Sequence, residues 1–324
     1  MKILANDGIS KVGQQILENA GFKVITDKVN QDNLINYINQ EHIEMLLVRS
    51  ATTARKDLID ACPNLKLIGR GGVGMDNIDV AYAREKGIHV INTPGASSQS
   101  VAELVMGQMF SMSRFLHDSF RNMPVKGCEE FSVLKKNYAK GVELRGKTLL
   151  IIGFGRIGQA LASYALGCGM QVQAVDFYTD PIAIPLNIAG MDNLSVDITP
   201  TDYLSDALPH ADYISIHVPK QKDGSAVLGK AEFAMMKEGV RLANAARGGV
   251  IDEVALIEAL DAGKVAFAAL DVFENEPKPN DALLKHPKIA CTPHIGAATL
   301  EAQDRVGSEL AETIIGIFKK QIAN

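Results

Sequence analysis

The sequence GKTLLIIGFGRIGQALASYALGCGMQVQAVD, at residues 146–176, decides the fold of this chain. Residues 148–152 form a short apolar run bounded by glycine, which predicts a buried β-strand. The run leads into GFGRIG, a G-x-G-x-x-G at residues 153–158, and then into a helical pattern. A second strand is predicted at residues 171–175. This order of strand, glycine-rich turn, helix and strand predicts the dinucleotide-binding unit of a doubly wound parallel sheet.

Each glycine of the turn has a predicted mechanical role. Gly153 permits the tight turn, Gly155 lets the backbone approach a pyrophosphate, and Gly158 lets the helix and the strand pack closely. The first turn of the helix directs its N–H groups and the positive end of its dipole at the same place. The alternative is that the glycines serve only a tight connection between strand and helix.

Asp176 favours the cofactor-binding interpretation and indicates which cofactor is bound. It lies 18 residues after Gly158, where a carboxylate can accept hydrogen bonds from both ribose hydroxyls of an adenosine. The same carboxylate would repel a 2′-phosphate, and the following Phe177 and Tyr178 supply no cation to neutralise one. We therefore expect the chain to bind NAD rather than NADP.

Length, composition and charge exclude several classes of protein. The 324 residues are enough for two domains, and 47% hydrophobic with 22% charged residues is typical of globular proteins. The net charge of −5 leaves no basic excess for nucleic acid. No apolar run reaches the roughly 18 residues of a membrane span, and no signal peptide is recognised. The four cysteines lack C-x-x-C spacing, which predicts buried thiols in a reducing cytoplasm and no metal site.

Residues 1–95 alternate between strand and helix patterns, which predicts a small α/β domain with a parallel sheet covered by helices on both faces. Arg49 and Ser50 follow an apolar strand, at the carboxyl end where ligands of open α/β sheets collect. Arg70 follows the next strand, and the glycines of residues 71–74 leave backbone N–H groups for an anion. We predict an anion-binding site here. The alternative is a pair of surface arginines beside a flexible loop.

The segment before the glycine-rich turn predicts a contact between subunits. A long helix is expected from Ser100 to about Phe120, followed by a polar, irregular stretch at residues 122–143. A segment of that length without a core pattern is usually functional or part of an interface. We predict an arm that reaches a second subunit, in a homodimer formed through the cofactor domain.

The rest of the chain completes the nucleotide-binding sheet, with strands predicted at residues 213–217, 241–245, 266–271 and 289–292. A last helix, at residues 300–319, has an apolar face that we assign to the core of the first domain. The expected fold is α/β, with two Rossmann-like or flavodoxin-like domains. Residues 96–295 form the NAD-binding domain, which is inserted into a discontinuous substrate-binding domain made of residues 1–95 and 296–324.

Three polar residues near the ends of these strands could carry out an alcohol oxidation. Histidine titrates near neutral pH, so His294 is the natural proton acceptor. Glu276 could fix the tautomer of the ring, and Arg247 could bind an α-carboxylate through two parallel hydrogen bonds. Each also has an ordinary structural explanation: a histidine at a helix start, a surface carboxylate and a loop cation.

The chain resembles the D-isomer-specific 2-hydroxyacid dehydrogenases over nearly its full length, and within that family it most resembles the short-form phosphoglycerate dehydrogenases. The likeness is carried by seven segments in the same order: VRSAT (48–52), GRGGVGMDNIDV (69–80), NTPGASSQSVAEL (92–104), GFGRIG with Asp176, ARGGVID (246–252), LDVFENEP (270–277) and TPHIGAAT (292–299). The loop GASS, at residues 95–98, departs from the asparagine-containing version of many phosphoglycerate enzymes.

The resemblance implies a role for each matching residue. Arg247 would bind and polarise the substrate, His294 would be the acid or base, and Glu276 would pair with it. The residues implied in NAD binding are Val73, Arg156, Ile157, Asp176, His217, Val218, Pro219, Ala245, Ala246, Asp271, Ile295, Gly296 and Ala297, besides the three glycines of the turn. The residues implied in binding substrate carboxylate or phosphate are Arg49, Ser50, Arg70, Gly71 and Gly72.

The expected reaction is NAD-linked oxidation of 3-phospho-D-glycerate to 3-phosphohydroxypyruvate, the first step of serine synthesis. An alternative is the same chemistry on an unphosphorylated acid such as glyoxylate, hydroxypyruvate or D-lactate. A different class of protein, an NAD-sensing binding protein, also remains open. The expected partner is therefore a small anionic substrate.

Overall fold

The computed structural model describes the backbone of residues 1–322 and the side chains of residues 1–318. The chain forms two compact units: unit 1 contains residues 1–98 together with the residues from 297 onward, and unit 2 is Gln99–Gly296. Both units are α/β, and both main sheets are parallel, which confirms the predicted fold class. The boundaries expected from the sequence, after residues 95 and 295, lie within three residues of these limits.

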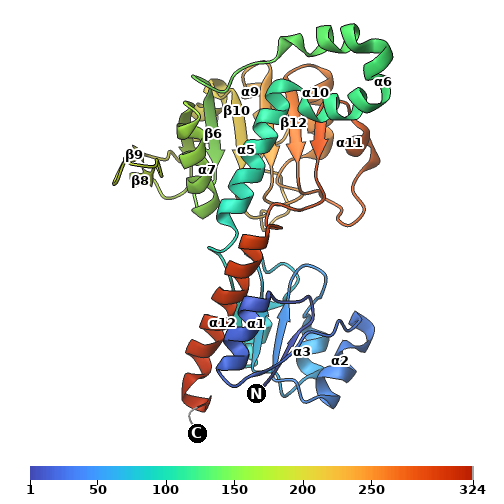
Figure 1. Ribbon diagram of the computed structural model, residues 1–324, viewed down its shortest axis with the longest axis vertical. Coiled ribbons are helices and arrows are strands. Elements are labelled where there is room, and N and C mark those ends of the chain that lie inside the picture. Colours follow the sequence, from blue (N-terminus) through green and yellow to red (C-terminus); the bar gives the residue numbers. More distant parts are fainter. Residues whose placement is uncertain (323–324) are drawn as a thin grey trace. The chain divides into compact units, whose positions relative to one another are not determined.

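Unit 1 is built on a five-stranded sheet in the order β2-β1-β3-β4-β5; most of it is drawn in blue in Figure 1. Its strands are β1 (Lys2–Ala5), β2 (Lys23–Ile25), β3 (Met45–Val48), β4 (Leu67–Arg70) and β5 (His89–Asn92). Its helices are α1 (Lys11–Asn19), α2 (Gln31–Gln40), α3 (Lys56–Ala61), α4 (Val80–Glu85) and α12 (Leu300–Ile322).

The strands of unit 1 contribute to two cores, because successive side chains of a strand point to opposite faces of the sheet. Leu4 and Leu46 pack with the side chains of α2, α3 and α4. Ile3 and Leu47 pack on the other face with α1 and α12, where Ile314 is fully buried. The core position predicted for the last helix is therefore confirmed.

The contact between α1 and α12 depends on two glycines, and it gives a first prediction. A Cβ added to Gly13 would lie 2.6 Å from the backbone of Gly307, where no flexible side chain can move aside. We expect Gly13→Ala to destabilise the protein by about 1–3 kcal/mol, because the two helices must separate. The shift of the urea unfolding midpoint measures this.

Gly316→Ala, on the outer side of α12, is the matched control. A Cβ at Gly316 meets nothing within 4 Å, so this replacement should stabilise the helix by about 0.5–1 kcal/mol. Equal midpoints for the two variants would show that the close approach of the helices has no energetic weight.

Unit 2 contains a six-stranded parallel sheet in the order β13-β12-β11-β10-β6-β7 and a separate two-stranded antiparallel sheet. The strands of the large sheet are β6 (Thr148–Ile152), β7 (Gln171–Val175), β10 (Tyr213–Ile216), β11 (Val240–Asn244), β12 (Val265–Leu270) and β13 (Ile289–Cys291). Its main helices are α5 (Ser98–Arg114), α6 (Leu116–Asn137), α7 (Arg156–Gly167), α9 (Lys230–Met235), α10 (Glu253–Asp261) and α11 (Asp281–Lys285).

Helices cover both faces of this sheet. On one face, Met109 from α5 and Leu161 from α7 share a core with Leu149 and Ile151 of β6; α5 and α7 are drawn on the same side of the sheet in Figure 1. On the other face, Leu256 from α10 packs in a second core with those strand residues whose side chains point to that face. The carboxyl ends of the parallel strands consequently lie at one edge, where the predicted site residues follow.

The predicted irregular stretch at residues 122–143 is wrong, because most of it belongs to a helix. Helix α5 ends at Arg114, Phe115 has a left-handed backbone (φ 58°), and α6 then continues to Asn137. Pro124 lies inside α6, so the sequence Asn-Met-Pro did not end a helix as expected. A short 3₁₀ helix, η1 (Tyr138–Lys140), follows.

Several short elements were not foreseen. They include α4 in unit 1, the hairpin of β8 (Ile182–Pro185) with β9 (Ser195–Ile198), and the short helices α8 (Leu204–Ala207) and η2 (Leu208–His210). The expectation of buried thiols was partly wrong, since Cys62 is buried but Cys128 and Cys291 are exposed. Among the described residues, no helix has the length and apolar character needed to cross a membrane.

Candidate active site

The glycine-rich turn between β6 and α7 is tightly packed at two of its three glycines and open at the third. Gly153 has φ +91°, and a Cβ there would lie 2.7 Å from the carbonyl oxygen of His217. A Cβ at Gly158 would lie 2.5 Å from the carbonyl oxygen of Gly153. Gly155 differs, because a Cβ there meets nothing within 4 Å. It caps the N-terminus of α7, so open space lies where the diphosphate of NAD would approach the backbone N–H groups.

Asp176 lies beside this turn. Its two carboxylate oxygens accept hydrogen bonds from the backbone N–H of Phe154, at 2.6 Å, and of Tyr178, at 3.1 Å. These bonds fix the carboxylate at the end of β7, the position at which an adenosine ribose is recognised in such sheets. The neighbouring side chains of Phe177 and Tyr178 are exposed.

The residues that follow β10 lie next to the glycine-rich turn. His217 and Val218 approach Gly153 so closely that only glycine fits there. The ring Nε2 of His217 shares a hydrogen bond of 2.8 Å with the hydroxyl of Ser215. Burial lowers the pKa of His217 to about 4, so this ring is neutral at physiological pH. The exposed Pro219 completes the segment implied in NAD binding.

A buried asparagine that the sequence did not single out shapes the turn that carries Arg247. The side-chain amide of Asn244 donates to the carbonyl oxygen of Arg247 at 2.9 Å, and its oxygen accepts from the N–H of Ala246 at 3.0 Å. The guanidinium Nη1 of Arg247 donates to the carbonyl oxygen of Ala246 at 2.6 Å. Ala245, next to them, is buried. The side chain of Asn244, at the end of β11, therefore fixes the conformation of the turn that follows this strand.

Glu276 and His294 form a hydrogen-bonded pair. Oε2 of Glu276 lies 2.7 Å from Nδ1 of His294, and Oε1 accepts the N–H of Phe273 at 2.9 Å. A carboxylate accepts hydrogen bonds, so Nδ1 carries the hydrogen and Nε2 presents a lone pair. His294 has a left-handed backbone with φ 55°. The arrangement suits a base that is oriented through its far nitrogen.

Within unit 1, the structure brings the predicted anion-binding residues together. The guanidinium Nη2 of Arg70 donates to the hydroxyl of Ser50 at 3.5 Å. A Cβ on Gly71 would lie 3.6 Å from the side chain of Arg49, and Gly72, with φ +141°, has no room for one beside Arg70. The exposed Val73 follows this loop. Two guanidinium groups therefore flank one glycine loop.

The loop of Arg49 is fixed by residues that were not predicted. Asp7 accepts hydrogen bonds from the backbone N–H of Arg49, at 2.7 Å, and from the N–H and hydroxyl of Thr52, at 3.0 and 2.8 Å. The amide of Asn77 donates to the carbonyl oxygens of Arg49 and Thr52. The position of Asp7 could have indicated this role, because Asp7 follows Asn6 at the end of the first apolar strand.

Ionised Asp7 should make stability depend on pH. Burial acts to raise the pKa of Asp7, but the bonds from Lys28, Arg49 and Thr52 outweigh it and lower the pKa. This contribution is fully present above the unfolded pKa of about 3.9 and is lost as the pH falls through the lower folded value. Asp7→Asn should lower the free energy of unfolding by about 1–3 kcal/mol at pH 7. The difference from the wild-type protein should be smaller at pH 3. Urea midpoints at both pH values test this.

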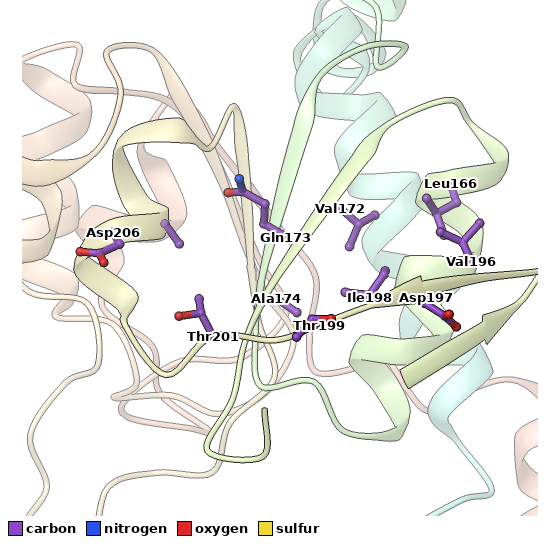
Figure 2. A pocket seen from close by; sticks show the side chains of 11 residues that line it. Leu166, Val172, Gln173, Ala174, Val196, Asp197, Ile198, Thr199, Thr201 and Asp206 are labelled. Atoms are coloured by element: carbon purple, nitrogen blue, oxygen red, sulfur yellow. The ribbon is translucent and has the colours of Figure 1, made fainter. Parts of the chain in front are cut away.

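One hollow in unit 2 is separate from these residues. It has a volume of about 500 Å³ and lies along the outer edge of β7, between that strand and β9 and α8. Figure 2 shows its side chains, with Gln173, Thr201 and Asp206 on one side and Val172 and Val196 on the other. It contains none of the predicted site residues. A second hollow of about 430 Å³ is lined by both Glu276 and His294.

Comparisons with known proteins place the chain in a family. A profile described as "D-isomer specific 2-hydroxyacid dehydrogenase, NAD binding domain" matches residues 106–296, more than half of the chain. A hydroxypyruvate reductase from Thermotoga maritima is 41% identical over 317 residues, covering 97% of each chain. A D-3-phosphoglycerate dehydrogenase from Methanocaldococcus jannaschii is 39% identical over 323 residues, covering all of this chain but 58% of its own length.

A solved structure is similar over the same extent. The crystal structure of a glyoxylate reductase from Paecilomyes thermophila has a TM-score of 0.82 and 26% identity, and the match covers 99% of this chain and 95% of that one. The chain belongs to the D-isomer specific 2-hydroxyacid dehydrogenase family. It is an NAD-dependent oxidoreductase, and its cofactor-binding domain lies in unit 2.

Proposed function

We propose that the protein oxidises 3-phospho-D-glycerate to 3-phosphohydroxypyruvate, and that it thereby serves serine synthesis. The observation that carries the proposal is the pair Arg49 and Arg70, which flank one glycine loop in unit 1. Arg247 alone would suffice for the α-carboxylate of a 2-hydroxy acid, so further guanidinium groups indicate a second anionic group on the substrate.

The residues of the site have distinct tasks in this reaction. Arg247 binds the α-carboxylate and polarises the reacting oxygen. Nε2 of His294 takes the hydroxyl proton while the C–H hydrogen leaves as hydride, and Glu276 stabilises the resulting imidazolium through Nδ1–H. Bound NAD supplies the hydride acceptor. In the reverse direction, His294 returns the proton to the carbonyl oxygen.

The rival proposal is reduction of an unphosphorylated 2-keto acid such as hydroxypyruvate. It is favoured by the hydroxypyruvate reductase of Thermotoga maritima, which this chain matches over 97% of both lengths. Such a substrate has no phosphate, so Arg49 and Arg70 would have no anion to bind beyond the carboxylate. The two proposals therefore differ in what these arginines contribute.

Kinetics with paired substrates separate the two proposals. If the phosphate is recognised, Arg49→Ala and Arg70→Ala should each lower kcat/KM for 3-phosphoglycerate by about 10- to 100-fold and leave that for D-glycerate nearly unchanged. Arg55→Ala is a control, since that exposed arginine pairs with Asp79. Equal losses on both substrates, or a wild-type preference for glycerate or hydroxypyruvate, would remove the phosphate from the proposal.

Asp176 provides a prediction on cofactor choice. Its carboxylate should make the dissociation constant for NADPH at least about 10-fold higher than that for NADH, because it repels the 2′-phosphate. Asp176→Ser should narrow this ratio by weakening NADH binding and improving NADPH binding. Fluorescence titration of the reduced cofactors measures both constants. Comparable affinities in the wild-type protein would contradict the assignment.

We also propose a homodimer formed through unit 2. Helix α6 buries only Leu134 among its described side chains, whereas Phe120 is 71% and Phe131 57% exposed. Exposed aromatic residues gathered on one helix are typical of a surface covered by another protein. The double variant Phe120→Asp/Phe131→Asp should be monomeric in sedimentation experiments. Val254→Asp, at an isolated exposed position on α10, should not change the mass. A monomeric wild-type protein would rule the dimer out.

A cytoplasmic location is the last part of the proposal. Cys62, Cys128, Cys168 and Cys291 are all free thiols. Exposed thiols such as Cys128 persist in a reducing compartment. Recovery of the native protein in the periplasmic or secreted fraction of its cells would contradict this.

A further inference from the structure

The outer edge of β7 presents backbone groups to the hollow described above. In the part of the chain that the structure describes, β7 pairs along its length with β6 alone. Gln171 donates its backbone N–H to the carbonyl oxygen of Lys147, so the odd-numbered residues of β7 direct their backbone groups toward β6. Because successive residues of a strand alternate in direction, the backbone groups of Val172 and Ala174 point to the outer edge.

The carboxyl end of this outer edge is covered, and the rest is open. The carbonyl oxygen of Ala174 accepts the N–H of Thr201 at 2.9 Å, and Asp176 donates its N–H to the carbonyl oxygen of Thr201 at 3.0 Å. Strand β9 lies nearby but pairs with β8 in a sheet of its own. Among the described residues, the N–H and carbonyl of Val172 and the N–H of Ala174 consequently have no hydrogen-bond partner.

The hollow of about 500 Å³ has walls on both faces of this open edge. Figure 2 shows Val172 and Val196 on one side of the strand, and Gln173 and Asp206 on the other. A strand added to the edge would therefore have one wall for each of its two sets of alternating side chains. Strand edges are usually protected by charged side chains or proline, and the sequence QVQAV of β7 contains neither.

The side chains that line the hollow indicate the charge of its partner. They include the carboxylates of Asp197 and Asp206 and no cation. Both residues are exposed, and neither forms an ion pair with any residue that the structure describes. The β7 edge of a second copy would bring two more carboxylates, and a nucleic acid would bring phosphates, so repulsion disfavours both. Lysine or arginine side chains next to apolar ones complement this lining.

We propose that the outer edge of β7 is a docking site for an extended segment of a partner protein in which apolar and basic residues alternate. The segment adds a strand to the sheet, and its backbone bonds the open groups of Val172 and Ala174. Its apolar side chains lie against Val172 and Val196, and its basic side chains pair with Asp197 and Asp206. The site is separate from the reaction, because its lining contains none of the residues predicted for catalysis or cofactor binding.

A short, end-capped fluorescent peptide of alternating lysine and valine is the probe. Fluorescence anisotropy should show saturable binding to the wild-type protein. Asp206→Lys should raise the dissociation constant by about 3- to 10-fold, whereas Asp57→Lys, the same charge change at an exposed position of α3, should not. Peptides with glutamate in place of lysine, or with a central proline, should not bind. Absence of saturable binding, or equal binding of the proline peptide, would overturn the proposal.

Amide hydrogen exchange distinguishes strand pairing from loose attraction between charges. Saturation with the peptide should slow exchange of the N–H groups of Val172 and Ala174 by at least about 10-fold, and leave that of Gln173, which faces β6, unchanged. Unchanged exchange at Val172 and Ala174 would contradict the proposal. Val172→Pro removes an open donor without breaking the β6–β7 ladder, so it should weaken peptide binding at an unaltered urea unfolding midpoint. If that variant fails to fold, the exchange of the wild-type protein decides.

Discussion

Replacement of His294 by alanine is expected to lower kcat by about 10²- to 10⁴-fold while NADH affinity is retained, because a proton acceptor contributes about that much. Nδ1 of this ring lies 2.7 Å from Glu276, which leaves Nε2 to exchange the proton. Steady-state kinetics with a panel of 2-hydroxy acids and NAD, together with fluorescence titration of NADH, give both quantities.

His210→Ala is the matched control, since that histidine is exposed at the end of η2 and should have no effect on kcat. Full turnover of His294→Ala would show that another group takes the proton. A wild-type protein that binds NADH but turns over none of the acids would favour the remaining alternative, a protein that senses NAD without catalysis.

Gly248→Ala adds one methyl group, and we expect this to be the most damaging such addition in unit 2. An added Cβ would overlap the carbonyl group of Phe273 and lie 2.6 Å from the backbone N of Glu274. At this point the turn that carries Arg247 touches the segment that leads to Glu276. Separating the two should destabilise the protein by about 1–3 kcal/mol and lower kcat/KM by about 100-fold.

Gly167→Ala, at the end of α7, is the matched replacement, because a Cβ there meets nothing within 4 Å. It should leave activity unchanged and stability equal or slightly higher. The urea unfolding midpoints and the kcat/KM values of both variants test whether the close contact at Gly248 affects stability and activity. If Gly248→Ala has wild-type activity and stability, the two loops can move apart without consequence, and Arg247 and Glu276 are positioned independently.

Some features of the site could be predicted because their signal lies in neighbouring residues. The glycine-rich turn is a local pattern, and Asp176 follows it at a fixed distance along the chain. Residues 146–176 alone were therefore sufficient to predict both features. The pairing of His294 with Glu276 was also expected from the chemistry of the two side chains. The structure adds which ring nitrogen is bonded.

The residues that were missed have partners far away in the sequence. Asp7 binds the backbone of Arg49 and Thr52, and Asn77 binds the same loop from the other side. Asn244 appeared only as an ordinary strand residue, although it shapes the turn of Arg247. Such side chains bond backbone groups, which exist in every residue, so nothing in the sequence identifies their partners.

Helix α6 was missed for a different reason. The usual sign of a helix is an apolar stripe that packs on a core, and α6 buries Leu134 alone among its described side chains. Its Pro124 further resembled a terminator. A helix that packs little against its own unit has a composition close to that of a loop.

The packing of α12 against α1 has a consequence for synthesis on the ribosome. One face of the unit 1 sheet is covered by Ala311, Ile314 and Phe318, which are translated after the whole of unit 2. Strands β1 to β5 therefore emerge early with only α1 to cover that face, whereas unit 2 can close its cores from contiguous chain. The segment made first is completed last, and a chaperone that shields apolar strands would act on residues 1–98 during that interval.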